Sequence, residues 1–218
     1  MTDDSLHGRL RSAILSLELT PGQRLSERGL EPDFGASRTP IRAALMRLES
    51  EGLVQRDGRN WLVSPLNLDE IRNLYEFREV LESGAVRLAA EHASPRDLKA
   101  LAELAGSSDD AAPPEHTLDA GTSFHLTLAR LSGNGFVLDA MQSTLTRLYR
   151  TRWLEVQSAA SRERANREHT AIANALLAGE VTHAELAILE HVRGTGQRLA
   201  DAVTNDRLGL RARGMTLD

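Results

Sequence analysis

The stretch SRTPIRAALMRL, residues 37–48, decides the fold of the N-terminal part of this chain. Its first residues are typical of a helix start, because the Ser37 hydroxyl can cap free backbone N–H groups and Pro40 lacks an N–H only where none is needed. Apolar residues then recur at the spacing of one helix face, at Ile41, Ala44, Leu45 and Leu48. We therefore predict a short amphipathic helix that buries one side.

Basic residues lie away from this apolar face. At about 100° per residue, Arg38 and Arg42 fall on the opposite side of the helix, and Arg47 lies on its flank. The stretch contains three arginines and no acidic residue. A helix with one buried face and a basic outer face suits the DNA major groove. An ordinary amphipathic helix with solvated arginines has the same pattern, so this helix alone leaves both interpretations open.

The neighbouring segments complete a small module. Apolar spacing predicts a first helix over about residues 5–18, and Ser26 can cap a short second helix. Two short apolar runs flank Asp57-Gly58, which is a hairpin signal. Three helices followed by a hairpin predict a winged helix-turn-helix domain over residues 1–64.

The remainder of the chain is predicted to be helical. Residues 65–67 form a short linker, residues 68–204 an all-helical bundle of about six helices, and residues 205–218 a loose tail. The expected helices cover about residues 68–93, 95–105, 117–132, 136–157, 162–178 and 182–204, with a polar loop at 106–116. The fold class is thus mainly α, with a small β wing.

Composition narrows the function classes. The chain has no cysteine, which excludes disulfides and thiolate metal sites. Its net charge of −5 argues against coating of nucleic acid through overall charge, yet residues 1–64 carry equal numbers of basic and acidic residues, so a local basic patch can still work. No long apolar run follows the N-terminus, and we expect a cytoplasmic protein without a membrane span.

Several segments of the first module resemble the winged helix of the GntR family of bacterial transcription regulators. They are LSER at 25–28, GASRTPIRAAL at 35–45 and LESEGLV at 48–54. The resemblance implies that operator DNA is contacted by Arg28, Ser37, Arg38, Thr39 and Arg42, and it matches Gly58 to the glycine of the wing tip. Gly29 and Pro32 depart from the family pattern, which has helix formers in the second helix.

Three of the seven histidines lie on or beside apolar stripes of separate predicted helices. They are His125, His169 and His191. Each one alone is typical of a hydrogen-bonded core histidine. Together, imidazoles that point into one bundle interior suggest a three-histidine site suited to Zn²⁺ or Ni²⁺.

The second half resembles the FCD effector domain of the FadR subgroup, in its six-helix, VanR-like form. The resemblance rests on FREVLE at 77–82, SFH at 123–125, SGN at 132–134, EHTAI at 168–172 and His191. It implies a divalent metal held by one Asp and three His, beside a small bound carboxylate. The three His correspond to His125, His169 and His191.

The aspartate of that pattern has no counterpart here. Its place, four residues before the first histidine, is Gly121, and Asp119 lies about 200° round the helix. Either a metal keeps an additional water or ligand oxygen, or its affinity is low, or the site holds none.

Arg78 lies on or near the apolar stripe of the long helix, where a guanidinium needs an anionic partner. It either clamps an effector carboxylate or forms an internal ion pair with Glu82. The sequence leaves both open.

We therefore expect a homodimeric, DNA-binding regulator whose operator affinity shifts when a small organic or sugar acid binds the helical domain. One alternative keeps the regulator but gives the helical domain dimerisation alone, with no metal. A metal-dependent hydrolase is the remote alternative, because the chain lacks a His-Glu-x-x-His motif and an obvious general base. We expect no enzymatic activity.

Overall fold

The computed structural model describes residues 5–106, 114–156, 158–205 and 209. The chain divides into two compact units, with a boundary after Leu68 and the second unit at Asp69–Ala202. Each unit is described by itself.

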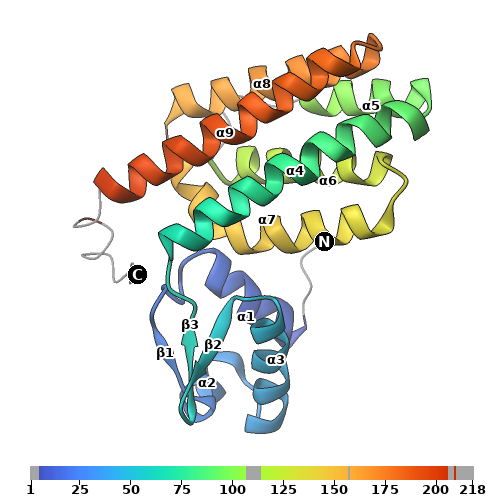
Figure 1. Ribbon diagram of the computed structural model, residues 1–218. Helices are drawn as coiled ribbons and strands as arrows, with labels where there is room; N and C mark the ends of the chain where they lie inside the picture. The colour runs from blue at the N-terminus through green and yellow to red at the C-terminus, as the bar shows by residue number, and fades with distance from the viewer. Residues whose placement is uncertain (1–4, 107–113, 157, 206–208, 210–218) are drawn as a thin grey trace. The chain divides into compact units, whose positions relative to one another are not determined.

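The first unit is a winged helix-turn-helix, as the sequence predicts (Figure 1). Its elements are α1 (Leu6–Leu15), β1 (Arg24–Leu25), α2 (Glu27–Phe34), α3 (Arg38–Ser50), β2 (Val54–Asp57) and β3 (Asn60–Val63). The strands form one antiparallel sheet in the order β1-β3-β2. The hairpin was expected from the sequence, whereas the pairing of Arg24–Leu25 with β3 comes from the tertiary structure.

One apolar core holds this unit together. The four apolar residues of α3 predicted to face inward are all buried, as are Trp61 and Val63 of β3. The core cluster comprises Leu10, Ile14, Leu25, Leu30, Ile41, Ala44, Leu45, Leu48, Leu53, Val54, Trp61 and Val63. Burial of one face of α3 fixes which of its residues remain at the surface.

The helix ends differ in detail from the prediction. Ser37 occupies the N-cap of α3, but its side chain makes no capping hydrogen bond and is exposed, so the predicted hydroxyl cap is wrong. α1 ends at Leu15 rather than near Glu18, because Leu17 has a φ of 64° and cannot continue a right-handed helix.

α2 forms despite its unfavourable Gly29 and Pro32. The Ser26 hydroxyl accepts a hydrogen bond from the Gly29 backbone N–H at 3.0 Å, which caps the first turn as expected. Gly35 ends the helix in the left-handed region at φ 61°, which suits a residue without a Cβ. Caps at both ends and the buried Leu30 therefore compensate for weak propensity.

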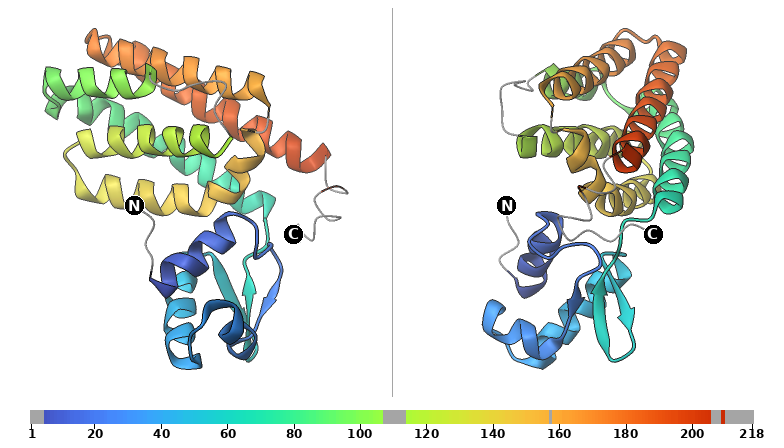
Figure 2. Two further views of the ribbon diagram at one scale, coloured as in Figure 1. Left: turned by 180° about the vertical axis from the view of Figure 1, so that it is seen from behind. Right: turned by 90° about the vertical axis from the view of Figure 1, so that its left-hand side faces the viewer.

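The second unit is the predicted bundle of six helices (Figure 1, Figure 2). They are α4 (Leu68–His92), α5 (Pro95–Gly106), α6 (Pro114–Leu131), α7 (Gly135–Glu155), α8 (Ala159–Leu177) and α9 (Val181–Asn205). α6 packs against α5, α7 and α8, and α4 and α9 run side by side in all the views. Among the described helices, none combines the length and apolarity that crossing a bilayer requires.

Two helices begin earlier than expected. α6 starts at Pro114, inside the predicted loop 106–116, of which residues 107–113 lie outside the described structure. α8 starts at Ala159 rather than 162, because the Ser158 hydroxyl accepts a hydrogen bond from the Ser161 N–H at 3.1 Å and caps the helix.

Candidate DNA-binding face and histidine cluster

The residues predicted to contact DNA are all at the surface of the first unit. Arg28 lies on α2, Ser37 caps α3, and Arg38, Thr39 and Arg42 project from the first turns of α3. Gly58 lies in the two-residue turn between β2 and β3, with φ +61°. The exposed residues therefore lie at the start of α3, on the neighbouring helix α2 and at the tip of the wing.

Acidic residues of α2 form ion pairs with Arg38 and Arg42 of α3. Arg42 donates from Nε and Nη2 to the two carboxylate oxygens of Glu27, at 2.6 and 2.8 Å. Arg38 donates from Nε to Glu31 at 3.2 Å. Both guanidiniums remain at the surface, with side chains 59% and 60% exposed for Arg38 and Arg42. The ion pairs thus orient these groups without burying them.

The hydrogen bond between Glu27 and Arg42 also shifts their ionisation. It raises the pKa of Arg42 above its ordinary value and, against a smaller effect of burial, lowers the pKa of Glu27. Both groups are therefore charged near neutral pH. A phosphate or a base edge that binds Arg42 must compete with the Glu27 carboxylate.

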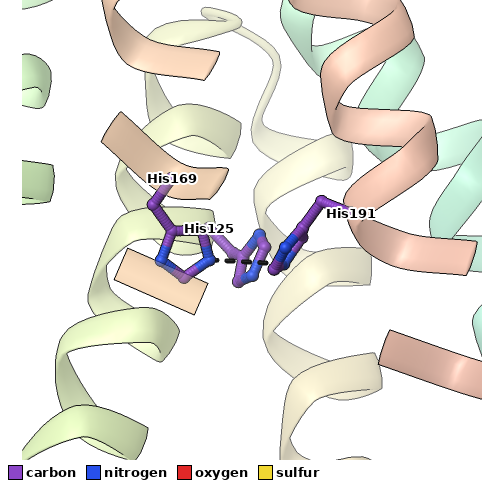
Figure 3. Close-up of side chains that lie close together, drawn as sticks. All are labelled: His125, His169 and His191. Carbon is purple, nitrogen blue, oxygen red and sulfur yellow. Dashed lines mark hydrogen bonds between the residues drawn. The ribbon is translucent and has the colours of Figure 1, made fainter. Parts of the chain in front are cut away.

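The three predicted histidines come together inside the second unit (Figure 3). His125 projects from α6, His169 from α8 and His191 from α9, and all three side chains are buried. One ring nitrogen of each lies within 4.8 Å of those of the other two. The Nε2 atoms of His169 and His191 are 3.3 Å apart. The juxtaposition predicted from the sequence is thus found in the structure.

Two carboxylates orient two of these rings. The Nδ1 of His125 donates to Glu82 Oε2 at 2.6 Å, and the Nδ1 of His191 donates to Glu168 Oε2 at 2.7 Å. Since both carboxylates can only accept, Nε2 is the unprotonated nitrogen in the neutral form of each of these two histidines, and that of His125 accepts a hydrogen bond from Nη2 of Arg78 at 3.1 Å.

Arg78 is fully buried beside them. Its Nε donates to Glu82 Oε1 at 2.7 Å, and its Nη2 lies 3.1 Å from the Nε2 of His125. The ion pair with Glu82 considered from the sequence is therefore formed. Arg78 also lines the cavity described below, so the ion pair does not remove it from a ligand's reach.

The electrostatics of the cluster favour the neutral form of His125 and of His169. Burial lowers the pKa of His125 to about 3, although Glu82 opposes the shift. Burial, together with the neighbouring imidazoles and arginines, also holds the pKa of His169 well below its ordinary value. Burial alone would raise the pKa of Glu82, but Arg78 and His125 outweigh it and keep this carboxyl ionised.

A cavity opens beside the histidines. Its empty space is about 380 Å³, including the part that opens to solvent. The polar side chains that line it include Arg78, Thr117, Arg152, Ser161, His169 and His191, and Gly121 lies among them. Its polar lining suits a small polar ligand.

Two family models cover these two units. The model described as "Bacterial regulatory proteins, gntR family" matches residues 2–61, and the model described as "FCD domain" matches residues 73–194. The chain belongs to the GntR family of bacterial regulatory proteins and carries an FCD domain.

Curated relatives of this GntR-family protein are transcriptional regulators. LutR of Bacillus subtilis is 33% identical over 202 residues, covering 80% of this chain and 90% of the relative. The Nta operon transcriptional regulator of Aminobacter aminovorans is 29% identical over 182 residues, covering 82% and 85%. These relatives and both families are regulators rather than enzymes, so the hydrolase interpretation is set aside.

Solved structures share the fold of this GntR-family chain. A putative GntR regulator from Rhodococcus sp. RHA1 has a TM-score of 0.76 at 22% identity, with 90% of this chain and 96% of that one covered. McbR/YncC of E. coli has a TM-score of 0.74 at 22% identity, with 92% and 96% covered. At 22% sequence identity, these two structures show that the fold is shared.

The three clustered histidine side chains of the FCD domain are ligands of a type that divalent metal ions bind. Three imidazoles converge, and two of them already donate their other nitrogen to a carboxylate, the arrangement that orients histidine ligands in metalloproteins. His169 would bind through Nε2 with its proton on Nδ1. The usual carboxylate ligand is missing, because Gly121 has no side chain.

Sequence reasoning missed three contributors to this site. Glu168 directly precedes His169 in a quoted motif, but its partner is His191, on another helix. Arg152 reaches the cluster from α7, and no motif or spacing in the sequence around it predicts this. Glu82 was considered only as a partner of Arg78, whereas it also bonds His125.

Proposed function

We propose that this GntR-family protein binds operator DNA through the exposed start of α3, Arg28 of α2 and the wing tip at Gly58. The supporting observation is that burial of the apolar face of α3 leaves Arg38 and Arg42 at the surface. A homodimer in the cytoplasm would present two such units to a two-fold operator.

The proposed effector is a small organic or sugar acid that binds the cavity of the helical unit. Arg78 binds its carboxylate, because a buried guanidinium is a strong and directional partner for this group. His125, His169 and His191 hold a divalent ion, Zn²⁺ or Ni²⁺, and such an ion supplies a Lewis acid to which carboxylate oxygens can bind.

Regulation then follows from differential binding. An effector shifts operator affinity only if it binds one arrangement of the protein better than another. The helices that supply the histidines, α6, α8 and α9, also carry much of the bundle's packing. A ligand that draws these helices together therefore biases the arrangement of the whole bundle.

DNA binding is tested by an electrophoretic shift with the DNA upstream of the gene. Arg38→Ala and Arg42→Ala should each weaken binding by about tenfold or more, the cost of losing one base or phosphate contact by arginine. Arg47→Ala is the matched control, since Arg47 lies on the flank of the same helix with its side chain 66% exposed. Unchanged affinity in both Arg38 and Arg42 variants would refute this assignment.

Effector and metal binding are tested by thermal shift against organic and sugar acids, with and without Zn²⁺ and Ni²⁺. A ligand of the folded state raises the melting temperature, and His169→Ala should remove the metal-dependent part. Metal analysis of protein purified without a His tag completes the test. A helical domain that serves only dimerisation would show neither acid nor metal binding, and its histidines would be core residues.

A further inference from the structure

Gly121 lies at a position that faces the histidine cluster. It precedes His125 by one turn on α6, so a side chain there would point to the same side. A Cβ at Gly121 would lie 3.1 Å from Nη2 of Arg152 and 3.3 Å from Cε1 of His169. The guanidinium of Arg152 therefore occupies the space that a side chain at 121 would need.

Arg152 reaches this space from α7 and is itself buried, with 6% of its surface exposed. Its Nη1 donates to Thr122 Oγ1 at 3.0 Å, which holds the guanidinium in place. It lines the same cavity as Arg78, which comes from α4. Two buried guanidiniums on different helices thus face one small space.

The charges around the cavity favour an anion. Two arginines, Arg78 and Arg152, line the cavity, and none of the described residues that line it is acidic. The acids Glu82 and Glu168, which bond histidines of the cluster, do not line it. Both acids are already engaged, since Glu82 bonds Arg78 and His125, and Glu168 bonds His191 and lies 3.7 Å from Arg198.

A hydroxyl in the same cavity points to a ligand as well. Thr117 is buried, with 6% of its surface exposed. Its Oγ1 has no hydrogen-bond partner among the residues that the structure describes. A buried hydroxyl without a partner is costly unless a ligand or water completes it.

We infer that Arg152 is a second effector-binding residue and that, with Arg78, it makes the cavity selective for short dicarboxylic acids over monocarboxylic acids. The inference rests on the proposed effector function and names its substrate class. Arg78 binds one carboxylate, Arg152 binds the other, and Thr117 donates to the bound acid. In this chain Gly121 stands where the family has a carboxylate ligand. Because Gly121 has no side chain, the guanidinium of Arg152 can occupy the space where that carboxylate would lie.

Isothermal titration calorimetry of the full chain tests this, with succinate and butyrate as probes of equal carbon number, in chelator and again with Zn²⁺. The wild type should bind succinate more tightly than butyrate by about tenfold or more, as expected for one additional charge-assisted contact. Arg152→Gln should lose this preference in every condition in which the wild type shows it. Arg152→Lys, which keeps the charge, should retain part of the preference.

Arg147→Gln is the matched control, because Arg147 is an exposed residue of the same helix that pairs with Glu70. It should leave both affinities unchanged. Gly121→Asp should weaken succinate binding, because its carboxylate would neutralise Arg152, and should strengthen Zn²⁺ binding measured by titration of metal alone. Circular dichroism verifies that each variant is folded.

The outcomes separate the two proposals. Butyrate and succinate bound equally by the wild type, or a preference that survives in folded Arg152→Gln, would overturn the dicarboxylate inference and leave the acid-binding function intact. Binding of neither acid would count against the proposed effector function and, with it, against this inference.

Discussion

Glu82 connects two other buried polar residues of the second unit. It is fully buried and its two oxygens bond Arg78 and His125, which project from different helices. A buried ion pair of this kind adds little net stability by itself, but removing one partner leaves the other charge without compensation. The identity of this single residue therefore has consequences for both the fold and the effector site.

Glu82→Gln keeps the shape of the side chain and removes its charge. We expect it to lower the free energy of unfolding by about 3–5 kcal/mol, because Arg78 would remain buried without the carboxylate that now bonds it. Urea denaturation followed by circular dichroism measures the change. Glu79→Gln is the control on the same helix, since Glu79 pairs with the exposed Arg193 and should cost no more than about 1 kcal/mol. Equal losses in the two variants would contradict this interpretation.

At the scale of elements, the close approach of α4 and α9 depends on a glycine. A Cβ at Gly196 of α9 would lie 2.9 Å from Cγ and 3.0 Å from Cδ1 of Tyr75, whose ring is buried on α4. Gly84, in the middle of α4, has nothing within 4 Å of the corresponding position. The two helical glycines thus differ in packing, although both are unfavourable by propensity.

Gly196→Ala and Gly84→Ala should therefore change stability in opposite directions. Gly196→Ala should destabilise the protein by about 1–3 kcal/mol through overpacking against Tyr75. Gly84→Ala should stabilise it by roughly 0.5–1 kcal/mol through reduced backbone entropy of the unfolded chain. Thermal and urea unfolding measure both, and destabilisation by Gly84→Ala would indicate that this face of α4 is covered in solution.

At the scale of the whole molecule, the buried histidines make stability depend on pH. His125 has a pKa of about 3 in the folded state and near 6.5 in the unfolded chain, so the unfolded chain binds its proton first as pH falls. Its contribution to stability is fully present above pH 6.5 and is lost as pH falls towards 3. His169 acts in the same direction.

We expect the free energy of unfolding, measured by urea denaturation in chelator, to fall by a few kcal/mol between pH 7.5 and pH 4. His125→Asn should flatten this dependence, because the group that takes up the proton is gone. His183→Asn should leave it unchanged, since His183 is an exposed residue of α9 whose side chain is 68% exposed. A wild-type stability that is constant over this range would refute the prediction.

The winged helix-turn-helix, the inward face of α3 and the bundle of six helices could be predicted from local periodicity and from motifs whose spacing lies within one helix or turn. The meeting of His125, His169 and His191 joins three helices, and it was predicted from their places on apolar stripes together with the resemblance to the FCD domain. Even the weak helix α2 was predictable, because Ser26 and Gly35 mark its ends.

The groups that surround those features could be identified only from the folded arrangement of the helices. Glu27 and Glu31 hold the arginines of α3, Glu168 orients His191, and Arg152 fills the space beside Gly121. Each of these contacts joins residues of different helices. The rotation and offset of one helix against another are set by the packing of the whole core, which a local pattern does not encode.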